Sequence, residues 1–317
     1  MTYKNKLICL LIIIAVLSLI YAGSYIFRYN ADNTRLASHI WIDSGAAAKI
    51  NRFMLDSGRE KLEFTKKGDQ WFVAHNNNEY PARRLRVEDF LGIFSARAQW
   101  PVRSSSGAAY DRFGLGDGAA RITLYENYSV LLDLLLGDDD ILGRESYFRK
   151  AGQSEIRSGD SNIRAYLAGD VKSWYNLRLI PETSGGSISI NNVQRLTVYS
   201  EWTSQVFARS ARSWSISGIN VVNPDIKNIE EYINFVLNAE GEDFIDSASE
   251  AALNLTDYNY SRITLEFGNG NVVTISMTEP DELNKRYAKV SNSGYIYQIP
   301  LWVTARLFRE AESFESN

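Results

Sequence analysis

The densest group of side chains able to do chemistry is a run of three carboxylates, Asp138, Asp139 and Asp140. Carboxylate oxygens are the ligands that hard cations such as Ca²⁺ and Mg²⁺ prefer. Calcium loops, however, space their ligands at alternate positions and carry a defining glycine and glutamate, which are missing here. The run follows Leu136-Gly137 between two expected strands, where a solvated polar turn is the ordinary structure. We therefore predict a turn and no metal or cofactor, with a cation site as the alternative.

Other catalytic chemistry has little to draw on. The chain has two histidines, and His75 is followed by three asparagines, which predicts an exposed loop histidine rather than a general base. The single cysteine, Cys9, lies in an apolar N-terminal stretch, so the rest of the chain offers no disulfide, thiolate zinc site or cysteine nucleophile. No phosphate-binding loop, nucleophile elbow or HExxH motif occurs. We predict a protein that is not an enzyme and has no catalytic residues.

Basic and aromatic residues are the candidates for binding. Arginines are concentrated in and after the first expected helix, where they could contact an acidic polymer, lipid head groups or an acidic partner; an ordinary solvated helix face is the alternative. We also predict that Trp100 and Trp174-Tyr175 lie at the surface. The residues predicted to contact a partner are Arg83, Arg84, Arg86, Arg97 and Trp100. The net charge of −4 argues against a nucleic-acid partner.

An apolar run from Leu7 to about Phe27 follows Lys4 and Lys6. Its roughly twenty residues match the length that crosses a hydrocarbon core as a helix. Positive residues before it favour an N-in orientation, which places the bulk of the chain on the extracytoplasmic, periplasmic side of the inner membrane. We predict a single-pass anchor over residues 1–28. A signal peptide cleaved near Ala22-Gly23-Ser24 is the alternative, and both interpretations export the protein.

Two halves of the remaining chain match in order, which predicts a tandem repeat. Arg121-Ile122-Thr123-Leu124 recurs as Arg262-Ile263-Thr264-Leu265, and Trp71 corresponds to Trp214. Because the two tryptophans occupy matching strand positions, we predict that they anchor two cores. The predicted repeats cover residues 29–180 and 187–317, joined by the turn-rich sequence from Pro181 to Gly186.

Each predicted repeat begins with short alternating strands, continues with an amphipathic helix and ends with an antiparallel meander and a closing helix. In the first repeat the helices are expected over 83–98, 107–113 and 162–168, and the last helix of the second repeat over 300–312. Strands followed by a helix and a meander are typical of an α+β fold. The predicted fold class is therefore an N-terminal transmembrane helix followed by two tandem α+β units, each with antiparallel strands and two to three helices.

An ordered series of short motifs resembles a known family. The series is Tyr80-Pro81-Ala82, Tyr110-Asp111-Arg112-Phe113-Gly114-Leu115, Leu136-Gly137 and Tyr147-Phe148-Arg149. It is similar to the domain-of-unknown-function 4340 family, whose members look like membrane-anchored exported bacterial proteins. The resemblance covers most of the first repeat and, more loosely, the second. It implies an association with ABC-transporter components of the type named for gliding motility, and it implies no reaction.

Together these features predict a membrane-anchored, extracytoplasmic binding or scaffold protein that works with a membrane partner, such as an ABC-type transport system. Two alternatives belong to other classes. One is a hydrolase of envelope polymer that uses Asp138–Asp140 or a cleft, and the other is a carbohydrate-binding module that stacks sugars on tryptophan.

Overall fold

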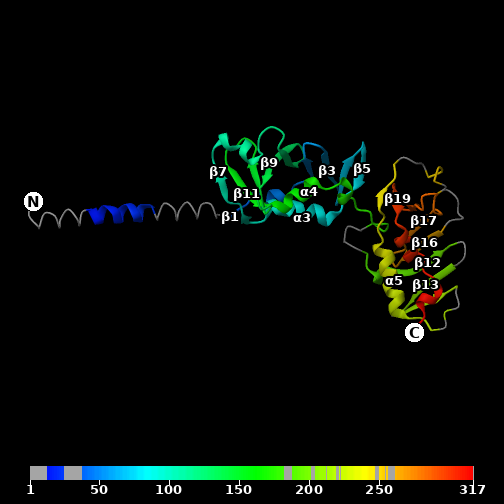
Figure 1. The fold of residues 1–317 in the computed structure, drawn as a ribbon. Helices are drawn as coiled ribbons and strands as arrows, with labels where there is room; N and C mark the ends of the chain where they lie inside the picture. The colour runs from blue at the N-terminus through cyan, green and yellow to red at the C-terminus, as the bar shows by residue number, and fades with distance from the viewer. Residues whose placement is uncertain are drawn as a thin grey trace, which may run out of the picture. The chain divides into compact units, whose positions relative to one another are not determined.

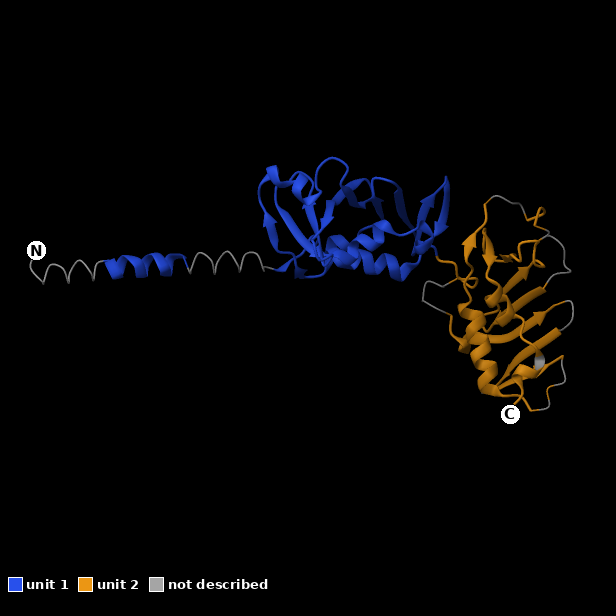
Figure 2. Cartoon of the chain, in the orientation of Figure 1, with its two compact units in different colours: residues 1–175 blue, residues 176–317 orange. Residues whose placement is uncertain are grey.

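The chain forms two compact units in a computed structural model, residues 1–175 and 176–317 (Figure 2). The structure describes residues 13–24, 38–181, 188–200, 204–211, 213–218, 221, 223–246, 250–253, 255 and 261–316. Every strand pairing among these residues is antiparallel, and helices are few and short (Figure 1). The predicted α+β class with antiparallel strands is confirmed.

Unit 1 is built on a nine-stranded sheet in the order β5-β4-β3-β2-β8-β9-β10-β11-β7. Helices α3 and α4 cover it on one side (Figure 1). The strands of unit 1 are β1 Ser38–His39, β2 Arg52–Asp56, β3 Lys61–Lys67, β4 Gln70–His75, β5 Asn78–Pro81, β6 Ala98–Gln99, β7 Val102–Ser104, β8 Ala120–Glu126, β9 Ser129–Asp139, β10 Glu145–Lys150 and β11 Ile156–Asp160. Of these, β1 and β6 form a separate two-stranded sheet. Its helices after residue 38 are α2 Ser44–Ala47, α3 Arg84–Ser95, α4 Arg164–Ala168 and the 3-10 turns η1 Gly107–Ala109, η2 Asp111–Phe113, η3 Ser161–Ile163 and η4 Val171–Trp174.

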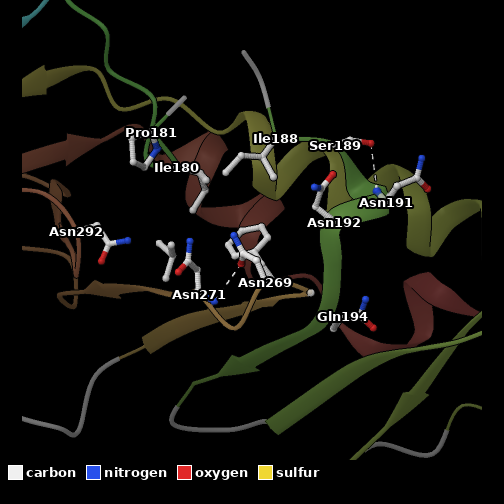
Figure 3. Close-up of a pocket in the computed structure, with 13 residues that line it drawn as sticks. Ile180, Pro181, Ile188, Ser189, Asn191, Asn192, Gln194, Asn269, Asn271 and Asn292 are labelled. Carbon is white, nitrogen blue, oxygen red and sulfur yellow. Dashed lines mark hydrogen bonds between the residues drawn. The ribbon is translucent and has the colours of Figure 1, made fainter. Parts of the chain in front are cut away.

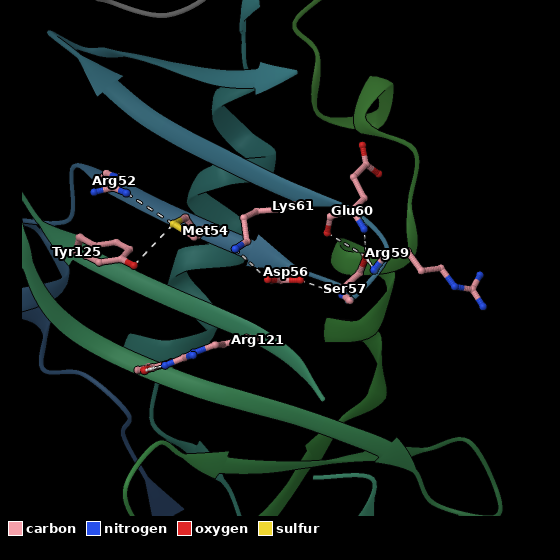
Figure 4. A network of polar contacts seen from close by, with 11 residues as sticks. Arg52, Met54, Asp56, Ser57, Arg59, Glu60, Lys61, Arg121 and Tyr125 are labelled. Atoms are coloured by element: carbon pink, nitrogen blue, oxygen red, sulfur yellow. Dashed lines mark hydrogen bonds and ion pairs between the residues drawn. The ribbon is translucent and has the colours of Figure 1, made fainter. Parts of the chain in front are cut away.

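Alternation along the strands separates the two faces of this sheet. In β2 the side chains of Phe53 and Leu55 are buried, while those of Arg52, Met54 and Asp56 lie on the other face and are partly exposed. The outward charges pair with neighbouring strands, as in Lys61 with Asp56 at 3.2 Å and Arg121 with Asp133 at 2.7 Å (Figure 4 shows the first pair and Arg121). The outer face thus carries ion pairs between neighbouring strands, and each of them contributes little to stability.

The core of unit 1 is an aromatic cluster between the sheet and its helices. Phe53 stacks on Phe64 at 4.2 Å, Phe64 meets Trp174 at 4.7 Å, and Phe90 of α3 meets Trp174 at 5.9 Å. Trp71 is 4% exposed and packs against Phe53. Trp214 is also buried, in unit 2, so the prediction that both tryptophans belong to cores is confirmed.

Unit 2 has an eight-stranded sheet in the order β14-β13-β12-β16-β17-β18-β19-β15. Its described strands are β12 Val193–Tyr199, β13 Ser204–Ser210, β14 Ser213–Ser217, β15 Asp243–Phe244, β16 Ser261–Phe267, β17 Val272–Met277, β18 Arg286–Val290 and β19 Ile296–Ile299. Its helices are α5 Ile226–Asn238, α6 Leu301–Leu307 and the 3-10 turns η5 Ile190–Asn192 and η6 Ala311–Phe314.

The main helix of unit 2 begins at a capped end and buries one face. Asp225 accepts hydrogen bonds from the N–H groups of Lys227 and Asn228, which satisfies donors that the first turn leaves free. Tyr232 donates to the carbonyl of Leu307 at 2.6 Å and packs against Phe314. Complete burial raises the pKa of Tyr232 well above its usual 10, so its hydroxyl remains a donor.

The two sheets share one strand order, apart from β5, which unit 1 adds at its edge. In both units a meander of four strands follows the main helix, and a strand that precedes this meander in sequence closes the far edge. In both units, too, the N-cap residue of the main helix donates its N–H to an aromatic residue of a late 3-10 turn. These bonds are Arg83 to the Trp174 carbonyl at 2.7 Å and Asp225 to the Phe314 carbonyl at 2.8 Å.

Several predicted helices are shorter in the structure. The helix expected over 83–98 ends at Ser95, because Ala96 is extended and leads into β6, which pairs with β1. The segment over 107–113 forms two 3-10 turns, and Gly114 ends the second in the left-handed region. The helix expected over 300–312 ends at Leu307, where Phe308 leaves helical geometry, and η6 follows separately.

Residues 13–24 are helical, with large apolar side chains exposed. The rest of the predicted anchor, including both ends of the run from Leu7 to Phe27, lies outside the described residues. Among the residues that the structure does describe, no helix combines the length and apolar character that a membrane crossing needs. The predicted linker also lies outside the described residues, except for Pro181. Residues before it belong to unit 2, since Leu179 donates to the carbonyl of Ala239.

Candidate functional site

The three adjacent carboxylates have separate structural roles. Asp139 accepts hydrogen bonds from the Ser146 hydroxyl and from Arg164 Nε, the latter at 2.9 Å. Arg164 also donates to the carbonyl of Gly137, so it ties α4 to the end of β9. No group of three potential metal ligands occurs among the described residues. The carboxylates therefore do not converge on a shared position. Asp138 and Asp139 belong to β9 rather than to the predicted turn, which begins only at Asp140.

Asp140 organises the β9–β10 turn. Its carboxylate accepts the N–H of Arg144 at 2.6 Å and that of Glu145 at 3.1 Å, while its carbonyl accepts the N–H of Gly143 at 2.9 Å. The backbone N–H of Glu145, followed by that of Arg144, holds the pKa of Asp140 below its usual 3.8. Gly143 adopts the left-handed φ of 65°, which allows the chain to reverse direction between β9 and β10. The Asp140 carboxylate thus holds the turn in shape by accepting hydrogen bonds from its backbone.

This turn exposes two large apolar side chains. Ile141 is 104% exposed and Leu142 is 69% exposed, so neither contributes to the core. Asp138 beside them is exposed as well. A single exposed apolar side chain is normal on a protein surface. Here two adjacent ones stand on a turn that a carboxylate holds in shape.

Unit 2 has the same device in its β17–β18 turn. Asp281 accepts the N–H of Leu283 at 2.9 Å and that of Lys285 at 2.8 Å, and its carbonyl accepts the N–H of Asn284 at 2.9 Å. The N–H of Lys285 is the main cause that lowers the pKa of Asp281, and a bond from the Tyr287 hydroxyl adds to it. Asn284 has φ 58°, and Leu283 is 75% exposed.

The two turns correspond residue by residue. Aspartate, leucine, a left-handed residue and a basic residue occur in the same order, with a constant separation of 141 residues. We name them the unit 1 tip, residues 140–144, and the unit 2 tip, residues 281–285. Sequence reasoning missed the tips, because Asp281-Glu282-Leu283-Asn284-Lys285 resembles Asp140-Ile141-Leu142-Gly143-Arg144 only at two identical positions.

The arginines predicted to contact a partner have different environments in the structure. Arg83 and Arg97 are exposed, and Arg84 pairs with Glu88 at 3.8 Å. Arg86 instead lies over the rings of Trp174 and Tyr166, at 4.7 and 4.9 Å, and burial lowers its pKa. A guanidinium sandwiched on two rings supports the core rather than a surface contact.

The predicted surface tryptophans are in fact buried, so that prediction is wrong. Trp100 is 2% exposed and packs against Trp41 and Phe148, and Trp174 is fully buried in the aromatic cluster. Tyr175 is 2% exposed. Trp100 lies in the short connection between β6 and β7, but its ring is turned into the core. Trp100 is therefore not available for a partner.

The prediction of an exposed loop histidine at position 75 is also wrong. His75 is the last residue of β4, and its side chain is 31% exposed. Its Nδ1 lies 3.0 Å from the hydroxyl of the buried Tyr175, and its Nε2 lies 3.9 Å from a carboxylate oxygen of Glu60. Because one ring nitrogen faces a core tyrosine, the residue joins the end of β4 to the chain immediately after η4.

Three motifs of the series, Tyr110–Leu115, Leu136-Gly137 and Tyr147-Phe148-Arg149, pack together in unit 1. Phe113 meets Tyr147 at 4.6 Å, and the Arg149 guanidinium lies 4.1 Å from the ring centre of Tyr110. A Cβ atom on Gly137 would lie 2.0 Å from the Phe113 carbonyl oxygen, so this approach requires glycine. A hollow of about 580 Å³ lies alongside, lined by Tyr110, Asp56, Arg121 and Arg149 among others. The motif thus fastens the η1–η2 segment to β9 and β10.

A family model described as Domain of unknown function (DUF4340) matches residues 71–258. This match covers more than half of the chain, and the chain belongs to this family. The matched region begins in β4 of unit 1 and extends into unit 2. The search of curated proteins and the search of solved structures found no match.

Proposed function

We propose that this chain is a non-enzymatic scaffold protein that docks on a membrane-protein partner through its two tips. The observation that carries the proposal is the recurrence of a carboxylate-capped turn with a solvent-exposed leucine, once in each unit. A largely exposed leucine contributes little to folding, whereas burying it fully in a partner contributes up to about 1.5–3 kcal/mol. A preformed turn also lowers the entropic cost of binding.

The proposal includes the duplication of one α+β unit. It is supported by the shared strand order of the two sheets, by the matching bonds from Arg83 to Trp174 and from Asp225 to Phe314, and by the two tips. Duplication gives a scaffold two related contact points, and two linked contacts bind more tightly than either alone when both can engage.

Membrane attachment and export complete the proposal. The apolar run from Leu7 to Phe27, with Lys4 and Lys6 before it, supports an anchor whose following residues lie outside the cytoplasm. The partner that the family resemblance favours is the membrane component of an ABC-type transport system.

The proposal is tested by photo-crosslinking in intact membranes. A photoreactive phenylalanine analogue replaces Leu142 or Leu283 in the full-length chain, and adducts are identified by mass spectrometry. Both positions should crosslink to the same membrane protein. Tyr128 is the control position, because it is 95% exposed at the β8–β9 turn and lies outside both tips.

A second measurement uses variants. Leu142→Ser and Leu283→Ser should each weaken the affinity for the partner identified by crosslinking by about 10- to 100-fold. The reason is the loss of one leucine that the partner would bury. Thermal unfolding should not change, since both side chains are exposed in the structure. Tyr128→Ser should leave recovery unchanged. Absence of adducts at both tips, or equal adducts at Tyr128, would overturn docking through the tips.

A further inference from the structure

The end of the unit 2 sheet contains a hollow of about 700 Å³ whose lining is unusual in composition (Figure 3). Ile180, Ile188, Phe267 and Val273 supply apolar surface. The polar lining is almost entirely carboxamide, from Asn191, Asn192, Gln194, Asn269, Asn271 and Asn292, with Ser189. None of the described lining residues carries a charge. The volume lies within the range of small-ligand sites.

Several of these amides are fixed so that their donors remain available. The oxygen of Asn191 accepts a hydrogen bond from Arg209 Nη2 at 3.0 Å, and the oxygen of Asn269 accepts the N–H of Asn271 at 3.0 Å (Figure 3 shows the second bond). Because each oxygen faces a donor, its NH₂ group is the part left for a ligand. The oxygen of Asn292 similarly accepts from the Ser291 hydroxyl at 3.4 Å.

The walls that carry these amides are joined to one another. Gly268 donates its N–H to the carbonyl of Asn192 at 2.8 Å, which connects the β16–β17 turn to η5. Phe267 donates to the carbonyl of Asn271 at 2.9 Å and closes that turn. Arg209 holds η5 through the carbonyls of Ile190 and Asn191, at 3.3 and 2.7 Å. These bonds occupy the Arg209 guanidinium, so it supports the site rather than offering a charge to it.

Three further side chains, those of Asn192, Gln194 and Asn271, make no hydrogen bond to any other described residue. Each presents both a donor and an acceptor. An array of neutral donors and acceptors beside an apolar surface matches a ligand with many hydroxyl groups and apolar C–H faces. It matches an anion poorly, because no cation is available in the described lining.

An extended peptide is also a poor match. Peptides that bind sheets add to a free strand edge. The strands that meet this hollow, β12, β16 and β17, are all interior strands with a partner on each side. We infer that the hollow binds a neutral saccharide. This inference rests on the amide lining and is independent of the tips.

The test starts from an array of neutral oligosaccharides probed with the full-length chain. The detergent must be zwitterionic and free of sugar, because glycosidic detergents would compete. At least one neutral oligosaccharide should bind, with a Kd between about 10 μM and 1 mM in a calorimetric titration. Absence of binding across the array would overturn the inference, as would tighter binding of tetra-alanine than of any saccharide.

Asn269→Asp is the informative variant, because a carboxylate still accepts the N–H of Asn271 while the NH₂ donor is lost. It should weaken saccharide binding about tenfold, the effect of one lost hydrogen bond. Asn77→Asp makes the same change at an exposed turn of unit 1 and should have no effect. Equal affinity of Asn269→Asp and the unchanged chain would contradict the assignment. Leu142→Ser and Leu283→Ser should bind saccharide normally, so failure of the docking proposal would leave this result standing.

Discussion

Gly137 shows why the family motif pairs a leucine with a glycine at the end of β9. The Phe113 carbonyl oxygen occupies the space of a Cβ atom at this position, at 2.0 Å, and Leu115 Cγ lies 2.8 Å from it. Arg164 also donates to the Gly137 carbonyl. Gly137 is therefore enclosed by the Phe113 backbone on one side and by the buried Leu115 side chain on another. Neither can move away from an added methyl group without loss of stability.

We expect Gly137→Ala to destabilise unit 1 by about 1–3 kcal/mol, the usual cost of forcing an extra methyl group into a packed site. Denaturant unfolding followed by tryptophan fluorescence would measure the change. The matched control is Gly92→Ala in α3, where nothing lies within 4 Å of the added Cβ. That change should stabilise by about 0.5–1 kcal/mol, because alanine loses less backbone entropy than glycine. Equal effects of the two substitutions would contradict the packing argument.

The acidic run illustrates what sequence could and could not predict at this scale. Glycine and aspartate are turn residues, so Leu136-Gly137 predicted that the strand ends before the acidic run. In the structure β9 continues to Asp139, and the turn begins only at Asp140. The separate roles of the carboxylates could not be read from the run. Asp139 is paired with Arg164, which lies 25 residues away in the chain. Only the packing of α4 against β9 brings these two side chains together.

The tips are the elements in which a titrating group controls local structure. The carboxylates of Asp140 and Asp281 are held ionised by backbone N–H groups, which lowers both pKa values below 3.8. A lowered carboxyl pKa means that the ionised form stabilises the fold above the ordinary pKa. This contribution is lost as the pH falls through the lowered, folded-state pKa.

We therefore expect the amide proton of Lys285 to titrate with a midpoint below 3.8, moving as Asp281 takes up a proton and its hydrogen bond weakens. A backbone amide NMR titration would measure it. Asp281→Asn keeps an acceptor oxygen but does not titrate, so the shift should vanish in that variant. A midpoint at or above 3.8 would show that the carboxylate is not held by the turn.

Helix lengths were the least predictable property of the elements. The apolar pattern of α3 continues to Ala98, yet the helix ends at Ser95 because Ala98–Gln99 pairs with Ser38–His39. The strand partner comes from a segment far earlier in the chain, so no local pattern signals it. Strands of the meander follow local alternation more closely, as in β10, where buried Ser146 and Phe148 alternate with partly exposed residues. Where local propensity did not determine the end of a helix, pairing with a distant strand did.

At the scale of the whole molecule, each unit contains a complete sheet and its own core. The aromatic cluster of unit 1 is closed by Trp174, and that of unit 2 by Phe314, each in a late 3-10 turn. The ordered sequence matches predicted a tandem repeat, but they did not point to the similar positions of Trp174 and Phe314, because the residue types differ. The same physical requirement, a large ring beneath the main helix, is met by two different side chains.

Two self-contained cores predict that damage in one unit stays in that unit. Phe64 and Phe207 are fully buried residues of β3 and β13, each opposite a residue of the adjacent strand, Phe53 and Leu196. Truncation of either to alanine should cost about 3–5 kcal/mol. Hydrogen exchange of the full chain, read by mass spectrometry, should then rise within residues 38–175 for Phe64→Ala and within residues 188–316 for Phe207→Ala. Equal rises in both regions for either variant would show instead that the chain unfolds as one cooperative body.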